Sequence, residues 1–134
     1  MAPATFMPVR SSNSSVLKWP ERHQVDAAVR AWAQAGAHPE LLRLGYFGSY
    51  ARGDWRVGSD LDPIALVSRS HQRFVRRALS WDLSPLPVAA DLIVYTHRDW
   101  KLLQEAGGRF AHTLAHETVW VAGKDLSDDG NGRI

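Results

Sequence analysis

A short connection between two apolar runs limits how this chain can fold. LLRLGYF (41–47) and LDPIALV (61–67) both have the composition of buried strands, and the segment between them runs only from Gly48 to Asp60. Parallel strands are usually joined by a crossover that contains a complete helix together with the loops on either side of it. The segment is too short for a full-length helix, so we expect these two strands to pair antiparallel.

The rest of the chain alternates between helical and strand patterns. Apolar residues at helical spacing predict a helix that follows Pro20 and ends near Gly36. Further helices are expected at 71–81 and 97–118, the last interrupted at Gly107 and Gly108, and further strands at 88–96 and 119–123. The predicted fold class is α+β, with a small mixed β-sheet and helices packed mainly on one face.

Length and composition indicate one ordinary soluble domain. The chain has 134 residues, of which 45% are apolar and 22% charged. It has no cysteine, which excludes disulfides and thiolate metal sites. No apolar stretch has the length of a membrane span, so we expect a cytoplasmic protein without membrane contact. The expected organisation is a flexible arm at 1–15, a folded domain at 16–123 and a polar tail at 124–134.

The charge pattern gives little support to a nucleic-acid partner. Sixteen Lys and Arg residues face fourteen Asp and Glu residues, which leaves a formal net charge of +2. The densest basic run is RSHQRFVRR (69–77), which is more typical of a solvated helix face than of a nucleic-acid patch.

Two aspartates at the start of the second strand predict a metal site. Residues i and i+2 of a strand point to the same face, so Asp60 and Asp62 should aim their carboxylates together. Neighbouring carboxylates repel unless a cation lies between them, and their hard oxygens suit Mg²⁺ or Mn²⁺. Asp91 lies in the predicted strand 88–96 and could complete a three-carboxylate cluster. Such clusters can hold two metal ions about 4 Å apart, as in enzymes of phosphoryl transfer.

A Gly-Ser pair precedes the aspartates and predicts a phosphate site. Gly48 ends the first strand, and SYARG can form one helical turn directly after it. Free backbone N–H groups at a helix start bind phosphate, and glycine permits close approach. Ser49 adds a hydroxyl donor, and Arg52 could reach a phosphate from the loop. We therefore expect this turn to hold a polyphosphate that is bridged by the metal ions of the aspartates.

The stretch GSYARGDWRVGSDLD (48–62) resembles the Gly-Ser and Asp-x-Asp signature of the nucleotidyltransferase superfamily that includes DNA polymerase beta. The small size is similar to its minimal nucleotidyltransferase (MNT) branch, and the resemblance runs from about Leu41 to Tyr95. It implies transfer of a nucleoside monophosphate from an NTP, ATP foremost, to a hydroxyl, with release of pyrophosphate. The acceptor could be a protein, an RNA end or a small molecule.

The resemblance also implies a role for each candidate residue. Asp60 and Asp62 would ligate both metals, and Asp91 would ligate the catalytic metal and help to activate the acceptor hydroxyl. Gly48 and Ser49 would hold the terminal phosphates of the nucleotide. Catalysis of this kind consists mostly of positioning and charge neutralisation.

Many small members of the MNT branch pair with a helical partner of the HEPN type as antitoxin and toxin. The resemblance therefore implies a HEPN-type partner or self-association, because little chain follows Tyr95 to bind an acceptor. The alternative is a catalytically silent module of the same fold that binds a nucleotide or a partner. Pro63 favours this alternative, because it follows the second aspartate at a position where the family usually has an aliphatic residue. Proline also has no backbone N–H to donate to a neighbouring strand.

Two other groups of residues have simpler interpretations. His112 and His116 lie four apart beside Glu117, but the HExxH order is absent, which favours a surface role over zinc binding. Tyr50 and Trp55 could stack on a base, although tryptophans more often pack in a core.

Overall fold

The structure is a computed structural model that describes residues 19–123, so the arm at 1–15 and the tail at 124–134 lie outside the described residues. It contains a four-stranded sheet in the order β3-β2-β1-β4. The strands are β1 (Leu41–Phe47), β2 (Asp62–Val67), β3 (Ile93–Thr96) and β4 (Val119–Gly123). The helices are α1 (Arg22–Gln34), α2 (Ser49–Arg52), α3 (Phe74–Arg77), the 3₁₀ turn η2 (Ala78–Ser80), α4 (His97–Ala106) and α5 (Arg109–Glu117).

The sheet is mixed, as the short connection predicts. β1 pairs antiparallel with β2 and with β4, whereas β2 pairs parallel with β3. The parallel pair is joined by a longer segment that contains α3 and η2. The expected α+β class is therefore confirmed.

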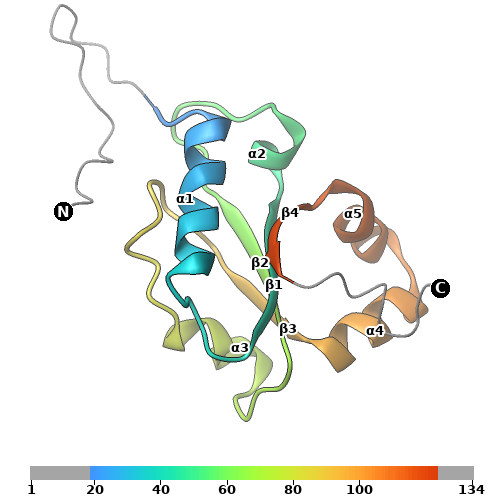
Figure 1. The fold of residues 1–134 in the computed structure, drawn as a ribbon. Coiled ribbons are helices and arrows are strands. Elements are labelled where there is room, and N and C mark those ends of the chain that lie inside the picture. The colour runs from blue at the N-terminus through green and yellow to red at the C-terminus, as the bar shows by residue number, and fades with distance from the viewer. Residues whose placement is uncertain (1–18, 124–134) are drawn as a thin grey trace, which may run out of the picture.

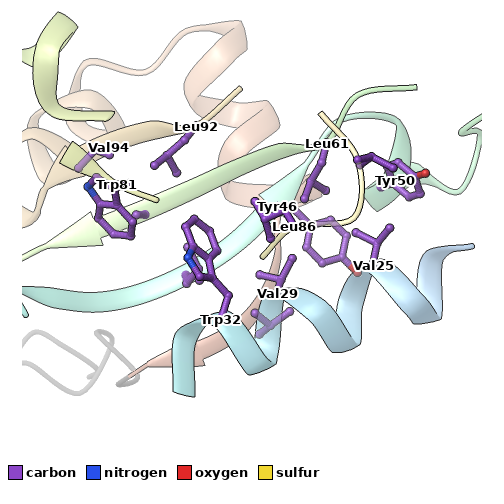
Figure 2. Packing of buried hydrophobic residues seen from close by; sticks show 14 of the residues in the cluster. Val25, Val29, Trp32, Tyr46, Tyr50, Leu61, Trp81, Leu86, Leu92 and Val94 are labelled. Carbon is purple, nitrogen blue, oxygen red and sulfur yellow. The ribbon is translucent and has the colours of Figure 1, made fainter. Parts of the chain in front are cut away.

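One face of the sheet packs against α1. This helix buries Val25, Val29 and Trp32, which meet strand residues such as Leu44 and Tyr46 in the main hydrophobic core. Figure 2 shows Val25, Val29, Trp32 and Tyr46 between the helix and the sheet. Burial of each large apolar side chain stabilises the fold by roughly 1.5–3 kcal/mol, so α1 is held mainly by this face.

The other face is covered by α4 and α5, which lie across the sheet from α1 (Figure 1). β2 is buried on both faces: Ala65 belongs to the α1 core, while Ile64 and Leu66 on the opposite face are also fully buried. Ala111 and Leu114 of α5 are buried as well. The helices thus divide between the two faces rather than gathering mainly on one.

Most predicted elements form, and two are shorter than expected. β1 and β4 match their predicted ranges, and the last helix is split at Gly107 and Gly108 as expected. The predicted helix 71–81 contracts to α3 and η2, and the predicted strand 88–96 contracts to β3. In residues 19–123, no helix is long and apolar enough to cross a membrane.

Pro63 explains why β3 starts late. The Leu61 N–H donates to Ala89 O at 2.8 Å, and the Asp91 N–H donates to Leu61 O at 3.0 Å. The next donor of this parallel ladder would be the nitrogen of Pro63, which carries no hydrogen. The bridge at Leu61 is consequently isolated, and continuous pairing resumes only where Ile64 meets Ile93.

Candidate active site

Gly48 and Asp62 are in direct contact at the junction of β1 and α2. Gly48 has a φ of 79°, a left-handed conformation that favours glycine. A Cβ atom on Gly48 would overlap Oδ2 of Asp62. The predicted phosphate turn and the predicted metal ligand therefore touch, and glycine is required there for two independent reasons.

The alternation of β2 and the residues before it aims the two predicted carboxylates together. Leu61 is fully buried in the α1 core, whereas Asp60 is exposed and Asp62 is half-buried. The buried leucine fixes the chain so that the aspartates on either side of it face away from that core. The sequence prediction from i, i+2 spacing agrees with this arrangement.

Asp91 joins these aspartates from the neighbouring segment. It is exposed and lies before β3 rather than within a strand, and its N–H is bonded to Leu61 O. Burial, followed by the charges of Asp91 and Asp60, raises the pKa of Asp62. Asp60 and Asp91 are therefore each close enough to Asp62 for their charges to act on it.

A fourth carboxylate, absent from the predicted site, lies on the Gly-Ser turn. The Gly48 N–H donates to Glu117 Oε1 at 3.0 Å, and Arg52 Nη1 lies 3.4 Å from Glu117 Oε2. Arg52 also pairs through Nε with Asp54 Oδ2 at 3.1 Å. Ser49 is the first residue of α2 and is half-buried beside this contact.

Sequence comparison agrees with this geometry. The model of the family described as "Nucleotidyltransferase domain" matches residues 36–119, well over half of the chain. The chain belongs to the nucleotidyltransferase domain family. The matched range contains Gly48, Ser49, Asp60, Asp62 and Asp91. The resemblance drawn from the Gly-Ser and Asp-x-Asp pattern is thus confirmed.

Solved structures similar to this nucleotidyltransferase domain support the same fold. One is a toxin–antitoxin with AMP-PNP, with 19% identity, a TM-score of 0.52, and coverage of 78% of this chain and 77% of that chain. Another is described as a nucleotidyltransferase from Sulfolobus solfataricus, with 18% identity, a TM-score of 0.51 and coverage of 74% and 80%. A third similar structure, whose TM-score of 0.48 is too low to support the fold, holds a tri-AMPylated Shewanella oneidensis HEPN toxin in complex with an MNT antitoxin, with 18% identity and coverage of 81% and 77%. No curated protein matches the sequence significantly.

The carboxylates suit a divalent cation by chemistry and charge. Among residues 19–123, no three His, Asp or Glu side chains are gathered tightly enough to enclose a metal ion as they stand. However, Asp60, Asp62 and Asp91 supply the hard oxygens that Mg²⁺ prefers. Burial, followed by the charges of Asp91 and Asp60, outweighs the lowering effect of Arg52 on the pKa of Asp62. The donor set therefore fits a divalent metal of this family.

In each of the two remaining pairs, Tyr50 with Trp55 and His112 with His116, the rings contact each other. Tyr50 is fully buried, donates its hydroxyl to Pro20 O at 3.1 Å and stacks on Trp55 with ring centroids 5.5 Å apart. Its ring is therefore occupied by a protein neighbour. His112 and His116 stack on each other at 4.0 Å on the exposed side of α5.

Proposed function

We propose that this nucleotidyltransferase domain transfers a nucleoside monophosphate from an NTP, ATP foremost, to a hydroxyl acceptor. The observation that carries the proposal is the contact between Gly48 and Asp62, which places the Gly-Ser turn against a carboxylate. The charges of Asp91 and Asp60 contribute to the raised pKa of this carboxylate. A polyphosphate on the turn would therefore lie beside the acidic side chains.

In the proposed site, Asp60, Asp62 and Asp91 would hold divalent metal ions, expected to be two Mg²⁺ or Mn²⁺. When bound, such ions neutralise the charge of the polyphosphate and of the leaving group. Gly48 and Ser49 orient the terminal phosphates through the N–H and the hydroxyl, and Arg52 contributes positive charge. The chain supplies mainly position and electrostatic complementarity.

The proposed reaction exchanges one P–O bond for another. The acceptor oxygen attacks the α-phosphorus, the bond to the β-phosphate oxygen breaks, and pyrophosphate leaves. The acceptor hydroxyl loses its proton to the Asp91 carboxylate, which is exposed and accessible to an incoming hydroxyl group.

We further propose that a HEPN-type helical protein is the partner that presents the acceptor. The described domain ends at β4 without a further acceptor-binding domain within residues 19–123. A structural neighbour described as a toxin–antitoxin with AMP-PNP supports such a pairing. Co-purification with the candidate partner, followed by mass detection of an added AMP, tests it. A stable complex that is never modified would restrict the pairing to binding.

The first test is a calorimetric titration of ATP with and without Mg²⁺, on wild type and Asp60→Ala. We expect Mg²⁺-dependent binding that falls at least about tenfold in the variant, because a lost charged ligand costs on the order of 1.5–3 kcal/mol. Asp82→Ala is the matched control, since Asp82 is exposed and bonds locally to Ser84.

A nucleotide-transfer assay on wild type and Asp62→Asn, run beside the titration, separates turnover from silent binding. Loss of nucleotide transfer with an intact fold supports the enzyme. Transfer undetectable in wild type with every candidate acceptor, together with intact ATP binding, would instead favour the silent module. If no triphosphate binds wild type, the proposed function is wrong for this chain.

A further inference from the structure

The carboxylate of Glu117 lies on the donors that the proposed function assigns to phosphate. It accepts the Gly48 N–H through one oxygen and faces the Arg52 guanidinium with the other. Both donors belong to the Gly-Ser turn and the single helical turn that follows it. Glu117 is the last residue of α5 and lies 69 positions after Gly48 in the sequence. Figure 1 shows the end of α5, next to the start of β4, near this turn.

This position is unfavourable for Glu117 in every other respect. A negative charge in the last turn of a helix opposes the helix dipole. Glu117 also raises the pKa of Asp62, in the same direction as Asp60 and Asp91, so it adds repulsion to an acidic site. The contacts with Gly48 and Arg52 are therefore what hold this side chain in place.

We infer that Glu117 is a built-in competitor of the terminal phosphates and must leave the Gly-Ser turn before a triphosphate can bind. The inference rests on the proposed function, because it concerns the same turn. A carboxylate and a phosphate oxygen are both anionic acceptors, and the Gly48 N–H has one hydrogen to give. Glu117 consequently closes the site to weak anions and yields to a polyphosphate with several charges.

The part of the contact that involves Arg52 is weak. Arg52 is 49% exposed, Glu117 is 19% exposed, and their separation of 3.4 Å is long for an ion pair. Arg52 also keeps Asp54 as a second partner, so release of Glu117 leaves it paired. Rotation of the glutamate side chain can remove the carboxylate without unfolding α5.

Inorganic tripolyphosphate with Mg²⁺ is the probe, titrated into the full ¹⁵N-labelled chain and followed by calorimetry and by the Gly48 amide signal. We expect Glu117→Gln and Glu117→Ala to bind about five- to tenfold more tightly than wild type, since they lose a competing negative charge. Glu105→Gln, the same change on the exposed surface of α4, should bind like wild type. Without ligand, Glu117→Gln should already shift the Gly48 signal, because a charge-assisted hydrogen bond is lost.

Equal affinity of wild type and both Glu117 variants would overturn the competition, and so would absence of binding in all of them. Weaker binding in Glu117→Ala would also overturn it, because Glu117 would then build the turn rather than block it. Tighter tripolyphosphate binding without Asp60-dependent ATP binding would support the inference while the proposed function fails. Asp60-dependent ATP binding with the same affinity in wild type and the Glu117 variants would support the proposed function while the competition fails.

Discussion

Gly48 meets two demands that no other residue type satisfies together. Its φ of 79° is costly for any residue with a Cβ, and its Cα lies against the Asp62 carboxylate. The backbone can therefore approach a carboxylate and offer it no steric obstruction. A small residue at this point makes the metal-binding and phosphate-binding parts of the proposed site contiguous.

Gly48→Ala should lower stability and abolish ATP binding. We expect a loss of about 1–3 kcal/mol from the strained backbone, and the added methyl group must push Asp62 out of place. Gly53→Ala is the matched control: Gly53 has a φ of 90° but open space where its Cβ would lie. Urea denaturation and ATP calorimetry on both variants check this. Equal loss of binding in the two variants would show that strain alone, and not the displacement of Asp62, is responsible.

Local spacing identified some candidate site residues and missed another for a physical reason. Asp60, Asp62 and Gly48 follow from a two-residue strand period and a turn, which are properties of adjacent positions. Glu117 contacts Gly48, which lies 69 positions earlier in the sequence, so no local pattern predicts this contact. Only the folded sheet, which places β4 beside β1, brings the end of α5 to the Gly-Ser turn.

The direction of strand pairing could be predicted where the length of the connection between two strands determines it. The short connection after β1 correctly predicted an antiparallel partner, and apolar composition located β1 and β4. The extent of β3 could not be deduced from its own residues, because it depends on a missing donor at Pro63 across the ladder. Pro63 thus shortens β3 next to Asp91. The ladder hydrogen bonds of Leu61, between Asp60 and Asp62, are still formed.

Pro63→Val should extend the parallel ladder without loss of function. The new N–H can donate toward the carbonyl of Asp91, and valine suits a fully buried strand position. Stability should change by less than about 1 kcal/mol, because the added hydrogen bond is offset by greater freedom of the unfolded chain. Hydrogen exchange should reveal a protected amide at position 63. An unprotected amide there would show that another constraint, not the missing donor, keeps the two segments apart.

Residues 19–123 enclose one sheet between helices on its two faces and place Gly48, Asp60 and Asp62 at the end of the sheet where β1 ends and β2 begins. Apolar packing on both faces of β2 supplies the stability that this end lacks. Asp62 is half-buried and close to other carboxylates, so its charged form carries an electrostatic cost that protonation or a bound cation would reduce. The fold therefore maintains an arrangement that its own stability does not favour.

Metal-free stability should consequently depend on pH in a way that Asp62 controls. Its raised folded-state pKa means that its contribution is most favourable below 3.8, the ordinary value, and is lost as pH rises through the shifted pKa. Asp99 acts in the opposite direction: Arg77 at 2.6 Å and the Thr96 cap overcome its desolvation and lower its pKa, so its stabilisation is lost as pH falls below 3.8. In EDTA, Asp62→Asn should therefore be more stable than wild type at neutral pH, and Asp99→Asn less stable.

Saturating Mg²⁺ should reverse the order of wild type and Asp62→Asn. A ligand at a hundred times its Kd that binds only the folded state adds about 2.7 kcal/mol, and the variant should gain little of it because a metal ligand and its charge are gone. Urea midpoints between about pH 4 and pH 8, with EDTA and with Mg²⁺, measure both effects. If Asp62→Asn is the less stable protein even in EDTA at neutral pH, its carboxylate supports the fold. Its position against Gly48 would then owe nothing to a metal ion.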